Sequence, residues 1–245
     1  MNISLLVNYD APSLLALNYL LPALEAHKLS VFYTDRAAKA GNDTEHKSSL
    51  LELASFDRQL LEKSNLAISF GGSYFQKANK INKDDFQKLA SSKPDLIVSI
   101  RHMTILRDDV IALPQHGVIN LHSGKLPTYQ GVMASFRAMQ NKEAELGTCL
   151  HFIEDSKIDT GAIIAESRSA ADYSRSYLWN VLNIYRAGCD NILSAIDQLT
   201  EGTTLNGYPQ VGDSHYYSYP SESDLVRADF PLYESTDSIS SFLNR

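Results

Sequence analysis

The N-terminal part of the chain alternates continuous apolar runs with an apolar pattern of helical spacing. Residues 3–7 and 29–33 are short apolar runs of the kind that form buried strands. Between them, leucines recur every three or four residues over 13–26, which predicts a helix. A strand–helix–strand beginning is typical of a doubly wound, mostly parallel sheet, so we expect an α/β fold of this kind.

The same patterns predict the remaining elements. Further strands are expected at 95–99, 117–122, 147–153 and 162–165, and further helices at 49–63, 84–90, 105–113, 132–141 and 176–199. Polar residues 36–48 predict a loop, and Gly71-Gly72 predicts a break. After Gly202 the composition shifts to Tyr, Ser, Pro and Asp. We therefore expect a catalytic domain over 1–202 and a short C-terminal annex over 203–245.

Composition and charge exclude several classes of protein. The formal net charge is −7, which is unfavourable for binding nucleic acid, because such binders present a basic face to phosphate. No apolar run reaches the length of a membrane-spanning helix, and the first basic residue is Lys28, so the N-terminus does not resemble a secretory signal. Cys149 and Cys189 are far apart and follow no zinc or disulfide pattern. We expect a cytoplasmic enzyme without a membrane or nucleic-acid partner.

Candidate chemistry begins where the strand at 117–122 ends. Asn120 and His122 are two residues apart, so their side chains point to the same side of a strand. Ser123-Gly124 and Pro127 then direct the chain into a loop. Ligands in open α/β sheets bind beyond the carboxyl ends of the strands, and these two side chains are therefore candidates for a site.

The acidic turn at 154–161 supplies a third group, Asp159, which can fold over the same edge of the sheet. Asn120 can donate a hydrogen bond to the oxyanion formed in acyl transfer, and His122 can stabilise that oxyanion or move protons. Asp159 can orient the imidazole or help to accept a proton from an attacking amine. An amine is itself the nucleophile, so no Ser or Cys is required. His116 and His122 match no familiar ligand spacing, and we expect no metal.

These residues belong to an ordered set of motifs that resembles a known family. Asn120-Leu-His122, Leu126-Pro-x-Tyr-x-Gly131, Gly147-x-x-Leu-His151 and Ile158-Asp-Thr-Gly161 together are similar to formyltransferases that use 10-formyltetrahydrofolate. The resemblance covers about residues 93–165 with strong motifs. It implies a Rossmann-like formyltransferase fold, the co-substrate 10-formyltetrahydrofolate, and Asn120, His122 and Asp159 as the catalytic trio.

The resemblance also implies where folate binds. In the family the folate pocket lies between a segment that matches 94–106 and the turn that matches 154–159. Arg101-His102 stands where the family commonly has Gly-Phe, which is a departure inside this pocket. The residues expected to contact the folate are Met103, Thr104, Leu106, Ile111 and Asp155.

Several groups of the family differ in the formyl acceptor. Initiator-tRNA enzymes carry a further C-terminal barrel, whereas we expect only a short annex after Gly202 here, and the chain is acidic. Purine-pathway glycinamide ribonucleotide enzymes have a glycine-rich phosphate loop where this chain has Asn8-Tyr-Asp-Ala-Pro12. Formyltetrahydrofolate deformylases usually carry an N-terminal regulatory domain, for which we expect no room here.

We expect a small-molecule acceptor with an amine or hydroxylamine, such as N-hydroxyornithine in siderophore biosynthesis, because 119–124 and 147–151 look most like enzymes of this kind. A nucleotide-linked amino sugar is the alternative acceptor. The sequence is also compatible with a formyltetrahydrofolate deformylase or with a non-catalytic folate-binding protein. The Tyr-rich C-terminal region is a candidate surface for a homodimer. The residues expected to contact the acceptor are Tyr9, Asp10, Tyr129 and Gln130.

Overall fold

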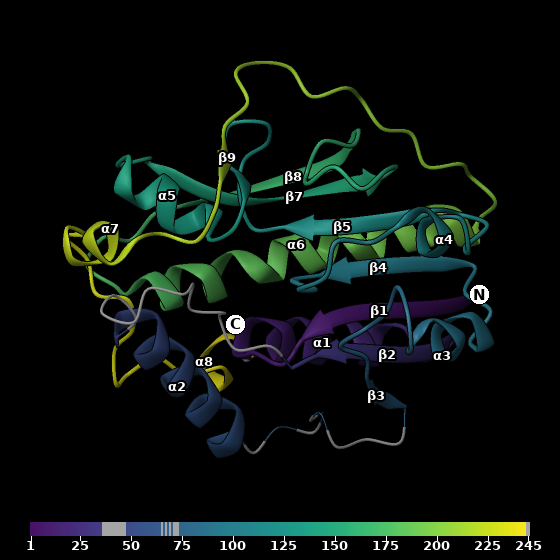
Figure 1. The fold of residues 1–245 in the computed structure, drawn as a ribbon, viewed down its shortest axis with the longest axis horizontal. Coiled ribbons are helices and arrows are strands. Elements are labelled where there is room, and N and C mark those ends of the chain that lie inside the picture. Colours follow the sequence, from purple (N-terminus) through teal and green to yellow (C-terminus); the bar gives the residue numbers. More distant parts are fainter. Residues whose placement is uncertain (36–47, 65, 67, 69, 71–73, 244–245) are drawn as a thin grey trace.

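A computed structural model describes residues 1–35, 48–64, 66, 68, 70 and 74–243 of the chain (Figure 1). The polar loop predicted at 36–48 lies outside the described residues except for Ser48. The break predicted at Gly71-Gly72 also lies outside them.

A seven-stranded sheet forms the centre of the molecule, with the strand order β3-β2-β1-β4-β5-β7-β8. The first five of these strands are parallel, and β7 and β8 continue the sheet antiparallel (Figure 1). The predicted mostly parallel α/β fold is confirmed. The strands are β1 (Asn2–Asn8), β2 (Lys28–Thr34), β3 (Phe75–Lys77), β4 (Leu96–Ile100), β5 (Val118–His122), β7 (Glu145–Ile153) and β8 (Ile163–Ala170).

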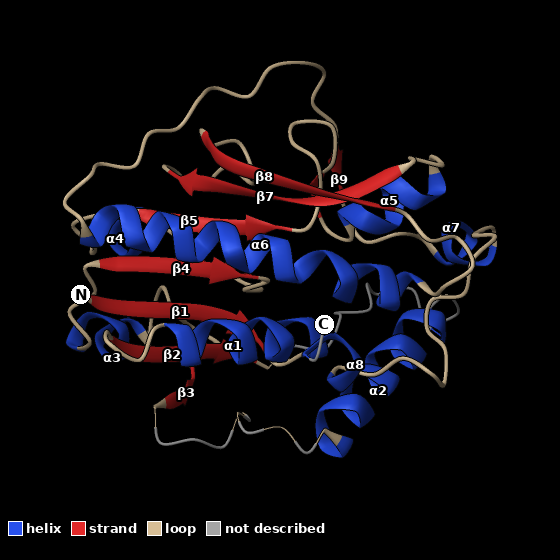
Figure 2. Cartoon of the chain, turned by 180° about the vertical axis from the view of Figure 1, so that it is seen from behind, coloured by secondary structure: helices blue, strands red, loops and turns tan. Residues whose placement is uncertain are grey.

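Helices cover both faces of this sheet because successive residues of a strand point to opposite sides. Leu5 of β1 packs into the larger core with α1 (Ala11–Ala23) and α6 (Tyr177–Thr200), which lie on one face (Figure 2). Its neighbour Leu6 packs into a second core, on the face that carries α3 (Phe86–Ser91) and α4 (Asp108–Ile111).

The annex packs onto the domain rather than apart from it. Strand β9 (Tyr216–Tyr217) pairs with β6 (Gln130–Gly131), which lies in the loop after β5. The remaining helices are α2 (Ser48–Lys63), α5 (Ala134–Gln140), α7 (Glu222–Val226) and α8 (Ser240–Leu243). The division at residue 202 and the homodimer surface stay predictions. Annex residues buried in the larger core are Leu205, Leu225, Phe230, Ile239 and Phe242.

Several predicted boundaries were wrong for physical reasons. Helix α1 begins at Ala11 rather than Ser13, because Asp10 caps it and Pro12 is compatible with a first turn. Helix α4 covers only four of the residues predicted at 105–113, and Ile105 is 56% exposed in the preceding loop. None of the helices in the described part of the chain combines the length and apolar content needed to cross a bilayer.

Candidate active site

A cavity of about 450 Å³ opens at the carboxyl ends of the central strands. Its wall includes Asn8 at the end of β1, Arg101 just after β4, and Asn120 and His122 of β5. Parallel strands end at the same edge of a sheet, which is where open α/β folds bind ligands. The predicted location of the site therefore coincides with a cavity.

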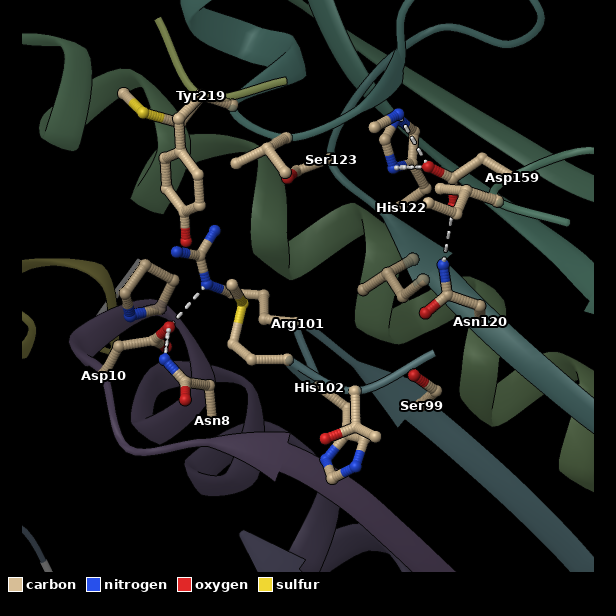
Figure 3. Close-up of a pocket in the computed structure, with 18 of the residues that line it drawn as sticks. Asn8, Asp10, Ser99, Arg101, His102, Asn120, His122, Ser123, Asp159 and Tyr219 are labelled. Carbon is tan, nitrogen blue, oxygen red and sulfur yellow. Dashed lines mark hydrogen bonds and ion pairs between the residues drawn. The ribbon is translucent and has the colours of Figure 1, made fainter. Parts of the chain in front are cut away.

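The three residues predicted to be catalytic meet at one end of this cavity (Figure 3). Asn120 and His122 project from β5, and Asp159 comes from the turn between β7 and β8. One oxygen of Asp159, Oδ2, lies 3.4 Å from Nδ1 of His122. The amide Nδ2 of Asn120 donates to the other oxygen, Oδ1, at 3.4 Å. The carboxylate thus contacts both of the other residues.

The turn that carries Asp159 is held from two directions. Asp159 has a left-handed backbone, with φ of 54°, which L residues rarely adopt without supporting contacts. The backbone N–H of Gly131 donates to Oδ2 of Asp159 at 2.8 Å. Gln210 of the annex and Gln130 of β6 both donate to the backbone carbonyl of Asp159, at 2.8 and 3.2 Å. These contacts fix the carboxylate in position.

Asp159 is ionised at neutral pH although it is buried. Burial raises the pKa of a carboxyl, because the charged form loses solvation. The charge of His122 opposes this effect, with hydrogen bonding and charge from His151 and a hydrogen bond from Gly131 N–H acting in the same direction. Together they lower the pKa of Asp159 to about 2.

His122 is oriented by both of its ring nitrogens. Nε2 lies 2.6 Å from the backbone carbonyl of Tyr129, and a carbonyl only accepts, so Nε2 carries a proton. Nδ1 is therefore the ring nitrogen that faces Asp159 and can exchange a proton. The side chain is buried, and its ring is held at both ends.

Sequence reasoning placed His151 in a motif but assigned it no role in the site. His151 lies opposite Asn120 in the antiparallel pairing of β5 with β7. Its Nε2 lies 3.1 Å from Nδ2 of Asn120 and 3.3 Å from Oδ1 of Asp159. The contact forms because β7 runs antiparallel to β5 in the register that places His151 opposite Asn120. The motif Gly147-x-x-Leu-His151 was the available signal for it.

The other end of the cavity is built around a second buried carboxylate, Asp10 (Figure 3). Nε of Arg101 donates to Oδ2 of Asp10 at 2.9 Å, and Asn8 donates to the same oxygen at 2.9 Å. Oδ1 accepts from the backbone N–H of Ser13 at 2.9 Å, so Asp10 caps helix α1. Burial raises the pKa of Asp10, but the charge of Arg101 and these hydrogen bonds outweigh it and lower the pKa.

Four of the five residues predicted to contact folate line the cavity, namely Met103, Thr104, Leu106 and Asp155. The fifth, Ile111, packs against the second core instead. The hydroxyl of Thr104 is buried and has no hydrogen-bond partner within the described residues. A buried polar group without a partner in a cavity wall is suited to a ligand with polar ring atoms.

The residues predicted to contact the acceptor divide in the same way. Tyr9 and Asp10 line the cavity, whereas Tyr129 and Gln130 are not part of its described wall. The ring of Tyr129 is only 2% exposed, and its hydroxyl donates to Glu143 at 2.8 Å. Gln130 contacts the backbone of Asp159 rather than open space. The structure therefore gives Tyr129 and Gln130 packing and supporting contacts.

No group of His, Cys, Asp and Glu side chains within the described ranges is arranged to hold a metal ion. Cys149 and Cys189 are both buried and are not bonded to each other. Burial raises the pKa of each thiol, which disfavours the reactive thiolate.

Comparison with known proteins identifies similar chains. A sequence profile described as formyl transferase matches residues 23–176. The methionyl-tRNA formyltransferase of Ectopseudomonas mendocina is 30% identical over 67% of this chain and 52% of its own length. The methionyl-tRNA formyltransferase of Syntrophomonas wolfei is 26% identical over 64% of this chain and 51% of its own length. The chain spans about half the length of these curated relatives.

Solved structures share the fold at low sequence identity. A sugar N-formyltransferase from Shewanella sp. superposes with a TM-score of 0.60 and 16% identity, covering 98% of this chain and 85% of that one. The N-formyltransferase of Helicobacter canadensis, in complex with folinic acid and dTDP-3-aminofucose, has a TM-score of 0.52 and 20% identity. It covers 87% of this chain and 70% of that one. At these identities the likeness shows a common fold.

Proposed function

Since this chain belongs to the formyl transferase family, we propose that it transfers a formyl group from 10-formyltetrahydrofolate to an amino nitrogen of a small molecule. One observation carries the proposal: Asn120, His122 and an ionised Asp159 converge at one end of a cavity. Amide, imidazole and carboxylate are the groups that acyl transfer to an amine requires.

Each residue has a distinct part in the proposed reaction. As an amine attacks the formyl carbon, the formyl oxygen gains negative charge. The amide NH₂ of Asn120 is a hydrogen-bond donor for that oxygen. The attacking nitrogen becomes acidic, and His122 accepts its proton at Nδ1, which faces Asp159. The bond between the formyl carbon and the tetrahydrofolate nitrogen then breaks, and that nitrogen takes up the proton as it leaves. Asp159 stays ionised and stabilises the positive charge on the imidazole.

The residues of this chain fit a folate donor. When bound, 10-formyltetrahydrofolate would supply the activated formyl group. Met103 and Leu106 offer apolar contact, and the unpaired hydroxyl of Thr104 offers a hydrogen bond to polar ring atoms. Asp155 is on the turn that leads to Asp159, so it would cover the donor from the side of the catalytic carboxylate. The folinic acid bound by the Helicobacter canadensis protein supports this choice of donor.

The acceptor that we favour is a small amine or hydroxylamine resembling N-hydroxyornithine. A nucleotide-linked amino sugar is the second candidate, because the fold is shared over most of both chains with a sugar N-formyltransferase. The curated relatives are named for methionyl-tRNA, but this chain carries a net charge of −7. That charge is unfavourable for the phosphates of tRNA.

An acceptor screen tests the proposal. The protein is incubated with 10-formyltetrahydrofolate and separate pools of amino acids, hydroxylated amines and nucleotide-linked amino sugars, and mass spectrometry detects the gain of a formyl group. We expect a product with the wild type and with His116→Ala, a matched histidine control outside the cavity wall, and none with His122→Ala. Consumption of the donor without a formylated product would indicate a deformylase. Donor binding without any turnover would indicate a non-catalytic folate-binding protein.

A further inference from the structure

Arg101 has an unusual backbone for an arginine. Its φ is 58°, in the left-handed region that glycine adopts readily and that is disfavoured for L residues. Glycine is the residue type that adopts this conformation most readily, and this chain has an arginine here. A bulky residue persists in this conformation where surrounding contacts hold it, and such positions cluster at ligand sites.

The side chain of Arg101 is directed into the cavity. It follows β4 and reaches Asp10 after β1, and 28% of it is exposed although it lies deep in the structure. Figure 3 shows the guanidinium between the carboxylate of Asp10 and the hydroxyl of Tyr219. Burial lowers the pKa of a guanidinium, but the charge of Asp10 outweighs it and raises the pKa well above the usual value. Arg101 is therefore a permanent cation at the cavity wall.

Asp10 does not use all of the donors of Arg101. A guanidinium has five N–H groups, and the contact with Asp10 is made by Nε alone. The N–H groups on the two Nη atoms form the planar fork that recognises carboxylate and phosphate. Tyr177 and Tyr219 also line the cavity, and Figure 3 shows the hydroxyl of Tyr219 beside the guanidinium. The charge of Arg101 also acts on the hydroxyls of Tyr177 and of buried Tyr185.

Asp10 has hydrogen-bond partners besides Arg101. Oδ1 accepts from Ser13 N–H and Oδ2 accepts from Asn8, and the carboxylate lies at the positive end of helix α1. Asp10 is the charged partner of Arg101, and this contact uses Nε and leaves the two Nη groups outside it. A ligand cation would find few free lone pairs on Asp10, whereas a ligand anion would find donors on Arg101 that Asp10 does not use.

The N-terminus of α1 is not available to a ligand. The N–H of Ser13 donates to Asp10, and the N–H of Ala11 donates to Asp57 of α2 at 3.0 Å. Helix N-termini at this place in α/β folds commonly bind phosphate, but here the protein's own carboxylates occupy these donors. Arg101 is the cation beside Asp10 at this end of the cavity, whereas Arg58, which also lines the cavity, pairs with Asp35.

We propose that the part of the cavity formed by Arg101, Tyr177 and Tyr219 is an anion subsite that binds a carboxylate or phosphate group of the formyl acceptor. This inference rests on the proposed function and adds the chemical class of the acceptor. The subsite holds the anionic group of the acceptor at one end of the cavity while its amine reaches Asn120, His122 and Asp159 at the other.

Matched acceptor pairs test the subsite. Ornithine is compared with 1,4-diaminobutane, which lacks only the carboxylate, and their hydroxylated forms are compared in the same way. An amino sugar 1-phosphate is compared with the free amino sugar, which lacks only the phosphate, and this pair distinguishes phosphate from carboxylate. For the wild type we expect kcat/KM to be about 10- to 100-fold higher for the anionic member of one pair.

Two substitutions at Arg101 and one control complete the experiment. Arg101→Gly suits the left-handed backbone and should reduce the preference for the anionic acceptor to about one, and Arg101→Lys should retain part of it. Arg107→Gly removes the same charge from an exposed position in the same loop and should keep the full preference. The double variant Asp10→Asn/Arg101→Gly, which leaves no unpaired charge, should lose the preference as well.

The outcomes separate the subsite from the proposed reaction. Equal losses for both members of a pair in Arg101→Gly would show that Arg101 only supports the structure, and the proposal would be overturned. A wild type that does not discriminate, or that prefers the diamine, would also overturn it. Calorimetric titration of the same pairs without donor measures the subsite independently of turnover. Discrimination in binding without any formyl transfer would refute the proposed function and leave the subsite in place.

Discussion

The two ends of the cavity are each organised around a buried carboxylate, but the two carboxylates have different partners. Asp159 faces two imidazoles, His122 and His151, a side-chain type that exists in a neutral and a charged form. Asp10 faces the guanidinium of Arg101, which is always charged. One end is therefore suited to moving protons, and the other to holding a fixed charge. The same residue type supports opposite chemistry, depending on what it is paired with.

Asp159→Asn removes the carboxylate at the end of the cavity that carries Asn120 and His122, and it should have the largest effect on the rate of formyl transfer. It removes the charge beside His122 but keeps an oxygen that can accept from Gly131 N–H. We expect formyl transfer to fall by about 10²- to 10⁴-fold, equally for anionic and neutral acceptors. Single-turnover measurements on the folded variant test this expectation. A rate near that of the wild type would remove Asp159 from the mechanism.

Asp10→Asn removes the carboxylate at the other end of the cavity. It should lower the free energy of unfolding more than Asp159→Asn does. Asparagine can still cap α1, but the guanidinium of Arg101 loses its counter-charge. We expect a loss of about 3 to 5 kcal/mol in the free energy of unfolding, measured with denaturant at neutral pH. The partners of Asp159 are imidazoles, which also have a neutral form, whereas a guanidinium stays charged. Equal losses in the two variants would contradict the distinction between titratable and fixed partners.

Asp57 is a further carboxyl in the cavity wall, and it lies near Asp10. Burial and the charge of Asp10 raise the pKa of Asp57 to about 7, although Ala11 N–H, Arg101 and Arg58 act against them. A carboxyl with a raised pKa contributes stability that is fully present below its ordinary value of 3.8 and is lost as the pH rises towards 7.

Asp57→Asn should abolish that loss. Between pH 5 and pH 8, the free energy of unfolding of the variant should gain about 2 to 3 kcal/mol relative to the wild type. Denaturant unfolding at the two pH values measures the difference. Asp84→Asn, at an exposed carboxyl on the surface, is the control and should show no such gain. A constant difference between Asp57→Asn and the wild type across this range would show that Asp57 is ionised throughout.

Gln210→Ala should have the smallest effect, because Gln130 still donates to the carbonyl of Asp159. We expect kcat to fall by less than about tenfold, and the free energy of unfolding to fall by about 1 kcal/mol, the contribution of a typical hydrogen bond. Gln198→Ala, at an exposed position of α6, is the matched control. An unchanged kcat would show that the annex does not help to position Asp159.

The central fold could be predicted because its strands are continuous apolar runs at the middle of a sheet. Strand β8 was predicted too short, at 162–165, because its later residues, including Glu166 and Arg168, are polar. They lie in an edge strand that is partly open to solvent. Strands β6 and β9 have two residues each, which is too short for any periodicity to appear.

Those parts of the site could be predicted whose geometry follows from spacing along the chain. Asn120 and His122 share a side because they alternate along one strand. Asp159 came from its place in a turn, and the family motif supported all three. The position of His151 depends on the register between β5 and β7, which is a long-range property. The contact of Arg101 with Asp10 depends on a left-handed backbone at Arg101, which cannot be predicted from the pattern of residues.

The pairing of β9 with β6 has a consequence for the order in which the protein matures. Asn120, His122 and Asp159 are synthesised well before Gln210 and the strand at 216–217. Chains fold progressively as they leave the ribosome, so the sheet and the trio can form while the annex is still inside the exit tunnel. Until the annex emerges, the turn of Asp159 lacks the contact from Gln210. A nascent chain would thus hold its reactive groups together without full alignment, and the alignment would be completed only once residues 210–217 have emerged.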